Sequence, residues 1–166
     1  MAIDGLGGVG HLGIHVADID RSLEFYCGLL GMELLTRFDE SDEVVRSAVG
    51  YPDASLKTAH LRIPESDLFM EVIEYVAPEG KAIDPQPANS GTVHLTFFVN
   101  DLQAAYDELV AAGVEPAGRV TDIPDQDREN GPIAALPHLH AILGGRTCYM
   151  KDPDGIRVEL MQRGPA

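Results

Sequence analysis

Two stretches of the chain repeat one another. Residues 9–26 read VGHLGIHVADIDRSLEFY, and residues 93–109 read VHLTFFVNDLQAAYDEL. At an offset of 83 residues, His11 aligns with His94 and Asp18 aligns with Asp101. Each stretch alternates in polarity and then changes to helical spacing, which predicts a half-buried strand that runs into a helix. A repeat of this kind predicts two similar structural modules.

The remaining segments extend the repeat through the whole chain. In the first half we expect a helix from Ile19 to Leu30 that ends at Gly31, strands at 32–38, 55–63 and 68–76, and a loop or short helix at 40–52. In the second half we expect a helix from Leu102 to Ala112, a weak strand at 114–123, a polar loop at 124–137 and a hairpin of strands 138–150 and 156–162. The order predicts an α+β protein with two tandem βαβββ modules, residues 8–77 and 91–163, joined by a Pro-rich linker within one domain of residues 1–166.

Charge and hydropathy exclude several classes of partner. The net charge is −15, with 27 acidic and 12 basic residues, so neither a nucleic acid nor an anionic membrane surface is an expected ligand. No apolar run approaches the roughly 18–20 residues that a membrane-spanning helix needs. The N-terminal residues lack the pattern of a signal peptide, and two cysteines are too few for a disulfide framework, so we expect a cytoplasmic protein.

Each module places a histidine in its first strand and a glutamate in its last. Glu71 and Glu159 lie within strands that are otherwise apolar, where a carboxylate is costly to bury unless it is paired, hydrogen-bonded or coordinated. If the outer strands of each module pair, His11, Glu71, His94 and Glu159 should converge on the face opposite the helix. Two imidazoles and two carboxylates suit a divalent metal ion with room left for substrate. A single strand histidine is more often structural, so the repetition carries the argument.

Other polar residues are weaker candidates. His15, Thr96 and Phe98 should line the same face as the histidine of their own module, either as substrate contacts or as wall residues. His138 and His140 are expected at the surface or at the rim of that face. Arg37, Arg46 and Arg146 could meet an anionic substrate, although a solvated arginine is the commoner role.

Four segments resemble those of a known superfamily. HLGIHVADIDRSLEFYCGLLGM, MEVIEY, VHLTFFVNDL and KDPDGIRVEL are similar to the vicinal-oxygen-chelate superfamily, which includes glyoxalase I, methylmalonyl-CoA epimerase, extradiol dioxygenases and bleomycin-resistance proteins. The resemblance implies a cupped mixed sheet with helices on its outer face. It also implies metal ligands at His11, Glu71, His94 and Glu159.

That ligand set most resembles glyoxalase I and the epimerases. It implies a metal-dependent lyase or isomerase that moves a proton at a carbon next to a carbonyl, with Glu71 or Glu159 as the base. The resemblance implies a divalent metal, with Ni, Co, Zn, Mn and Fe all open, a small-molecule substrate as partner, and a homodimer as the assembly. Two alternatives remain: an Fe(II) extradiol-type dioxygenase, and a non-catalytic protein that binds an antibiotic.

Overall fold

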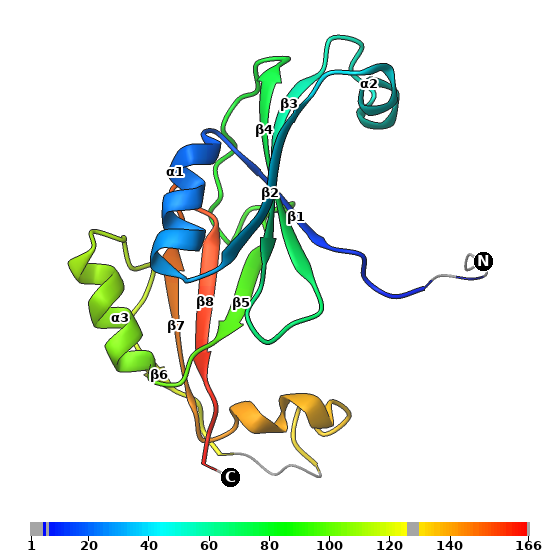
Figure 1. Cartoon of the computed structure of the whole chain (residues 1–166). Helices are drawn as coiled ribbons and strands as arrows, with labels where there is room; N and C mark the ends of the chain where they lie inside the picture. The colour runs from blue at the N-terminus through cyan, green and yellow to red at the C-terminus, as the bar shows by residue number, and fades with distance from the viewer. Residues whose placement is uncertain (1–4, 6, 126–129, 166) are drawn as a thin grey trace. The chain divides into compact units, whose positions relative to one another are not determined.

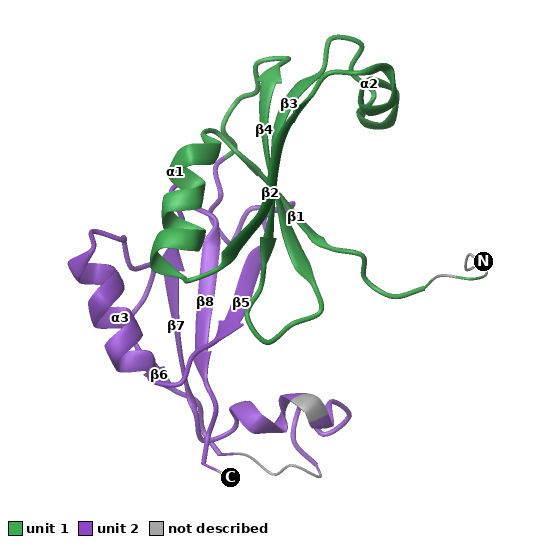
Figure 2. Cartoon of the chain, in the orientation of Figure 1, with its two compact units in different colours: residues 1–83 green, residues 84–166 purple. Residues whose placement is uncertain are grey.

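The chain forms two compact units, residues 1–83 and 84–166 (Figure 2). The structure is a computed structural model that describes residues 5, 7–125 and 130–165. Each unit contains one four-stranded mixed sheet, and this α+β architecture of two modules confirms the fold predicted from the repeat (Figure 1). Within the described ranges, no helix combines the length and the apolar character that crossing a membrane requires.

The first unit has strand order β1-β4-β3-β2. β1 runs parallel to β4, and the other neighbours are antiparallel. Its elements are β1 (Leu12–Val16), α1 (Ile19–Leu23), the π-helical turn η1 (Glu24–Leu29), β2 (Glu33–Glu40), α2 (Glu43–Val49), β3 (Ser55–Arg62) and β4 (Phe69–Ala77). The predicted helix to Leu30 therefore changes character after Leu23, and the N–H of Leu30 donates to the carbonyl of Phe25.

The second unit repeats this topology with strand order β5-β8-β7-β6. β5 runs parallel to β8, as β1 does to β4. Its elements are β5 (His94–Phe98), α3 (Leu102–Ala111), β6 (Thr121–Asp122), the 3₁₀ helix η2 (Pro137–Ile142), β7 (Arg146–Lys151) and β8 (Arg157–Gln162).

The core of each unit lies between its sheet and its helix. In the first unit Ile14 and Val16 of β1 are buried on the side that α1 covers, while His15 between them is exposed. In the second unit Leu95 is buried beside exposed His94 and Thr96. The alternation therefore places the histidines on the face opposite the helix, as the sequence predicted.

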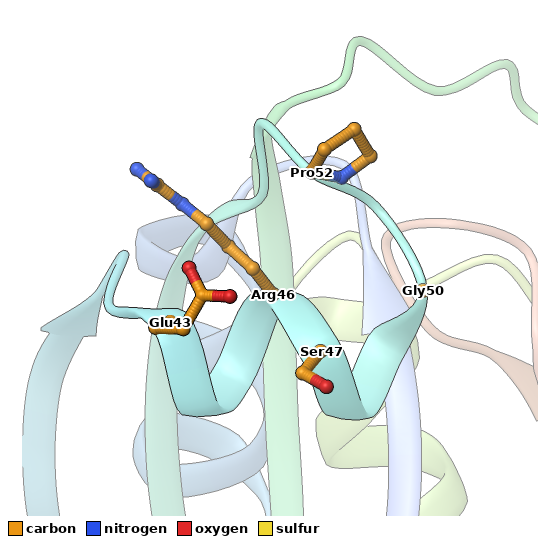
Figure 3. Close-up of a pocket in the computed structure, with 5 residues that line it drawn as sticks. All are labelled: Glu43, Arg46, Ser47, Gly50 and Pro52. Atoms are coloured by element: carbon orange, nitrogen blue, oxygen red, sulfur yellow. The ribbon is translucent and has the colours of Figure 1, made fainter.

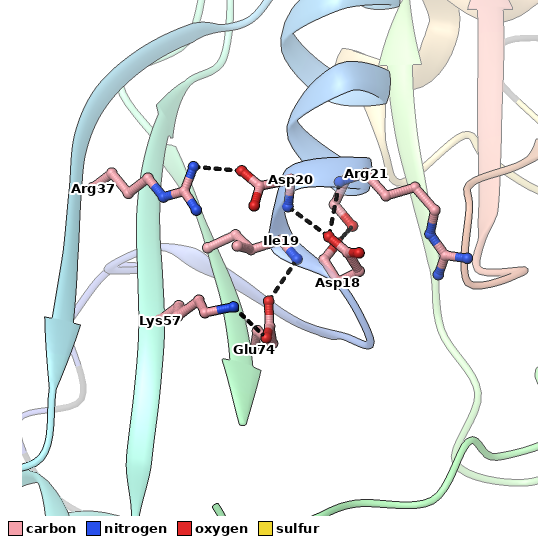
Figure 4. A network of polar contacts seen from close by, with 8 residues as sticks. Asp18, Ile19, Asp20, Arg21, Arg37, Lys57 and Glu74 are labelled. Carbon is pink, nitrogen blue, oxygen red and sulfur yellow. Dashed lines mark hydrogen bonds and ion pairs between the residues drawn. The ribbon is translucent and has the colours of Figure 1, made fainter. Parts of the chain in front are cut away.

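In each unit, one side chain of the last strand accepts a hydrogen bond from the first N–H of the helix. The N–H of Ile19 donates to Glu74 Oε2 at 2.9 Å, and Lys57 Nζ donates to Glu74 Oε1 at 2.7 Å (Figure 4). In the second unit the N–H of Leu102 donates in the same way to Gln162 Oε1 at 2.9 Å. A partner for this helix N–H is needed because the first turn has no internal acceptor.

Aspartates cap both helices just before these anchors. Asp18 accepts from the N–H groups of Asp20 and Arg21, and Asp101 accepts from the N–H of Ala104. Arg37 of β2 pairs with Asp20 at 2.6 Å (Figure 4), and this bond lowers the pKa of the Asp20 carboxyl. Both predicted starts of the helices are therefore confirmed.

Three strand predictions were wrong in extent. The first strand begins at Leu12 and not at Val9, so His11 precedes β1 by one residue. The weak strand at 114–123 is reduced to β6, since Pro116 has no N–H for a ladder and makes only an isolated bridge with Met150. The strand predicted from His138 begins only at Arg146, because Pro137 starts a 3₁₀ helix and Gly144 turns the chain with φ +71°.

Candidate functional site

The first unit brings His11 and Glu71 together. The parallel pairing of β1 and β4 sets Gly13 beside Glu71, which leaves His11 two residues upstream on the same face. His11 Nε2 lies 3.3 Å from Glu71 Oε2, with side chains 44% and 23% exposed. The imidazole and the carboxylate are therefore close enough to interact, and both remain accessible to solvent.

The second unit repeats this pair with His94 and Glu159. Thr96 of β5 lies beside Glu159 of β8, in the register that Gly13 and Glu71 occupy in the first unit. His94 Nε2 lies 3.6 Å from Glu159 Oε2. The His94 side chain is 54% exposed, whereas that of Glu159 is only 7% exposed. The two predicted histidine–glutamate pairs thus form within their own units.

The chemistry of each pair fits a divalent cation. Two atoms bound at about 2.1 Å to one ion lie about 3.0 Å apart at an octahedral edge and about 3.4 Å apart at a tetrahedral edge. The two nitrogen–oxygen separations, 3.3 and 3.6 Å, are close to these values. In the described part of the chain, however, no three His, Cys, Asp or Glu side chains are already grouped as a metal site. The shared set of four ligands remains a prediction.

Hydroxyl groups hold the carboxylate of Glu159. Thr96 Oγ1 donates to Oε2 at 3.0 Å, and Thr147 Oγ1 donates to Oε1 at 2.9 Å. Burial, together with a hydrogen bond to Glu159 and its charge, raises the pKa of Tyr149 to about 12, so this phenol stays protonated at neutral pH. Thr96 was predicted to meet substrate, and in the structure its hydroxyl orients Glu159.

A second histidine holds the carboxylate of Glu71. His60 of β3 lies opposite Glu71 of β4, and its Nε2 is 3.2 Å from Glu71 Oε1. Reasoning from the sequence missed His60, but the turn at 64–67 carries the signal. If Pro64 and Asp67 are the ends of the turn, each strand residue before Pro64 pairs with the residue equally far after Asp67. His60, four residues before Pro64, then pairs with Glu71, four residues after Asp67.

The predicted substrate contacts differ between the units. His15 packs edge-on against Tyr75, with ring centroids 5.6 Å apart. Phe98, at the position of His15 in the second unit, lies under the guanidinium of Arg163, 4.2 Å from the ring centroid. A cation above an aromatic face is an attractive arrangement. Nothing in the residue pattern singles out Arg163 as a functional residue.

The weaker candidates have structural partners. Arg37 pairs with Asp20, Arg46 donates to the carbonyl of Ala54, and Arg146 bonds Asp122. His140 Nε2 lies 3.2 Å from the carbonyl oxygen of Ile133. The side chain of His138 lies outside the described residues.

Two surface hollows differ in their relevance. One lies at α2 and is lined by Glu43, Arg46, Ser47, Gly50 and Pro52, none of which belongs to a histidine–glutamate pair (Figure 3). The other, of about 480 Å³, lies in the second unit and is lined by His94, Tyr149 and Arg157 among others. This second hollow has a size typical of small-molecule sites.

Known proteins resemble the whole chain. A profile of the Glyoxalase/Bleomycin resistance protein/Dioxygenase superfamily matches residues 8–160. A probable lactoylglutathione lyase of Vibrio parahaemolyticus is 32% identical, over 96% of this chain and 94% of that protein. A 2-epi-5-epi-valiolone epimerase of Actinomyces sp. is 31% identical, over 96% of this chain and 81% of that protein. The chain spans only 35% of a probable chloroplastic lactoylglutathione lyase of Arabidopsis thaliana, which is 29% identical.

Solved structures share the fold. A glyoxalase family protein of Bacillus cereus superposes with a TM-score of 0.79 at 20% identity, over 99% of both chains. The trypanothione-dependent glyoxalase I of Leishmania major superposes with a TM-score of 0.59 at 21% identity, over 92% of this chain and 84% of that one. At these identities the likeness concerns the fold. The family match over residues 8–160 and the relatives at 31–32% identity show that this chain belongs to the Glyoxalase/Bleomycin resistance protein/Dioxygenase superfamily.

Proposed function

We propose that this chain is a metal-dependent lyase, isomerase or epimerase that transfers a proton at a carbon next to a carbonyl. The observation that carries the proposal is the repeated pair: His11 with Glu71 in one unit, and His94 with Glu159 at the corresponding positions of the other. A structural role alone would not require the same two residue types in the same register twice. The relatives named as lactoylglutathione lyases and an epimerase support this class of reaction.

The ligands we propose for a divalent ion are His11, Glu71, His94 and Glu159. When bound, such an ion would supply positive charge that stabilises negative charge developing on substrate oxygens. The family resemblance leaves Ni, Co, Zn, Mn and Fe as candidates.

The proton transfer itself falls to the chain's own carboxylates. A glutamate within reach of a carbon acid can take the proton as a general base and return it as a general acid. Return to a neighbouring carbon gives isomerisation, whereas return to the same carbon from its other side gives epimerisation and calls for a second acid. Glu71 and Glu159 supply two candidates. Two exposed side chains, His15 on the histidine face of the first unit and Phe98 on that of the second, would then contact the rest of the substrate.

Substitution of each glutamate tests the proposed base. We expect Glu159→Gln and Glu71→Gln to differ in their effect on kcat, with the base variant losing at least about 100-fold. Turnover is measured as formation or consumption of lactoylglutathione and, separately, as epimerisation of 2-epi-5-epi-valiolone. Glu79→Gln, at an exposed glutamate of the linker, is the matched control. Unchanged turnover in both site variants would exclude a carboxylate base at either position.

Metal analysis separates the proposal from its alternatives. Protein purified without chelator should contain nickel, cobalt, zinc or manganese if it is an isomerase or lyase. Iron, with oxygen uptake on a catechol, would instead favour the dioxygenase. Ligand binding by protein that takes up no divalent ion would favour an antibiotic-binding protein. Sedimentation of the same sample tests the expected homodimer.

A further inference from the structure

Each oxygen of the Glu71 carboxylate faces its own imidazole. His11 Nε2 lies 3.3 Å from Oε2, and His60 Nε2 lies 3.2 Å from Oε1. The two contacts come from opposite directions, since His11 precedes β1 and His60 lies on β3, the strands on either side of β4. One oxygen is therefore occupied by His60, and the other is directed to His11.

The ring of His60 is itself held in place. Thr36 Oγ1 of β2 lies 3.1 Å from Nδ1. Phe69 and Phe38 pack edge-on against the ring, with centroids 5.0 and 5.5 Å away. An ionised carboxylate can only accept, so Nε2 must donate to Glu71, and in the neutral ring Nδ1 then accepts from the Thr36 hydroxyl. The contacts thus select both the orientation and the tautomer of His60.

The second unit supports its carboxylate from the same strand position. Tyr149 lies opposite Glu159 as His60 lies opposite Glu71, and Tyr149 also hydrogen-bonds the carboxylate. Thr147 Oγ1 adds a further hydrogen bond to Oε1 of Glu159, whereas the hydroxyl of Thr58, its counterpart in the first unit, has no hydrogen-bond partner among the described residues. Support of the carboxylate from this position is therefore common to both units, although the supporting residue differs.

We propose that His60 is a positioning residue for the metal centre. It fixes Glu71 through Oε1 and so leaves Oε2, beside His11 Nε2, free to bind the ion. This inference rests on the proposed function, because it gives His60 a task only if Glu71 is a ligand. Partners of this kind commonly change metal affinity 10- to 100-fold when removed.

Two substitutions of His60 distinguish a positioning role from a packing role, because the two roles predict opposite orders of Zn²⁺ affinity for the variants. Glutamine retains an N–H donor for Glu71 but fits poorly between two phenyl rings. Leucine fits between Phe38 and Phe69 but donates nothing. If His60 positions Glu71, His60→Leu should weaken binding of Zn²⁺ about 10- to 100-fold, and His60→Gln should stay within a few-fold of the unchanged protein. Thr36→Val, which removes the hydroxyl behind the ring, should produce a smaller loss in the same direction.

The measurement is the Kd of Zn²⁺ for the full chain stripped of metal, by competition with a colorimetric chelator. Glu71→Ala serves as the reference for a lost ligand, and circular dichroism checks that each variant is folded. If Glu71→Ala loses affinity while His60→Leu binds Zn²⁺ normally, the positioning role is refuted and the proposed function stands. Stronger binding by His60→Leu than by His60→Gln would also refute it. If the unchanged chain binds no divalent ion, both proposals fall.

Activity at varied metal concentration adds a second readout. A positioning defect should lower turnover of His60→Leu at limiting metal and recover at saturating metal. A loss that persists at saturation with unchanged Kd would refute the role assigned to His60.

Discussion

Replacing two equivalent threonines should change stability in opposite directions. Thr58 is 1% exposed, and its hydroxyl has no hydrogen-bond partner among the described residues. A buried polar group without a partner costs about 1–3 kcal/mol. Valine replaces this hydroxyl by a methyl group of similar size, so we expect Thr58→Val to raise the free energy of unfolding by about 1 kcal/mol. For a chain of this length, that gain corresponds to an increase of about 2–4 °C in Tm.

The matched variant is Thr147→Val in the second unit. The Thr147 hydroxyl donates to the carboxylate of Glu159 at 2.9 Å, and hydrogen bonds to charged groups contribute about 1.5–3 kcal/mol. We therefore expect Thr147→Val to lower the free energy of unfolding by about that amount, although the chemical change is identical. The two positions differ in that the Thr147 hydroxyl has a partner and its side chain is only partly buried, whereas Thr58 is buried without a partner.

Urea denaturation and thermal melting, both followed by circular dichroism, measure the two effects. If two transitions are resolved, each substitution should move the transition of its own unit. A loss of stability in Thr58→Val would mean that its hydroxyl has a partner in the folded protein, and the reasoning would fail. Equal effects of the two substitutions would fail it as well.

Further outcomes follow from the surroundings of three residues: Glu74, Cys148 and Gly145. Glu74→Ala should lower the free energy of unfolding by about 1–2 kcal/mol, because the N–H at the start of α1 loses its acceptor, and Glu74→Gln should lose less; urea titration distinguishes them. Burial raises the pKa of the Cys148 thiol to about 11, so a thiol reagent at pH 8 should modify Cys27 and spare Cys148 until the protein unfolds. Because the folded-state pKa of Cys148 is the higher one, its contribution is complete below about pH 9 and is lost as the pH rises towards 11, visible as a falling free energy of unfolding. Gly145→Ala would place a Cβ 2.1 Å from a backbone carbonyl oxygen and should destabilise by about 2 kcal/mol or more, whereas Gly118→Ala, with open space around it, should not.

The repeat made the architecture and the two pairs predictable. Strand periodicity places His11 and His94 on a definite face, and the parallel pairing of the first and last strands of each unit brings Glu71 and Glu159 to them. The contacts across β3 and β4 are harder to predict, because a slip of one residue would turn His60 to the other face. The contact of Thr36 with His60 also depends on an irregularity between Leu34 and Thr36 in β2, which leaves no signature in residue type.

The strand predicted at 138–150 was wrong in its first eight residues. Residues 138–145 alternate enough to resemble a strand, but Pro137 favours the start of a helix. Gly145 lies so close to the backbone of Gln162 that only glycine fits, and the strand begins after it. Such close approaches depend on segments distant in sequence, which residue-by-residue periodicity does not include.

The anchors at Glu74 and Gln162 bear on how such a chain tolerates insertions. Each connects the first turn of a helix directly to the last strand, which is also the strand that carries the glutamate of the histidine–glutamate pair. The intervening loops therefore do not set the position of the helix. In the second unit Glu159 follows His94 by 65 positions, whereas in the first unit Glu71 follows His11 by 60, yet both units keep the same register. Loops between the second and last strands are thus the places where new segments could be grafted, and the chemistry redirected, without disturbing the ligand strands.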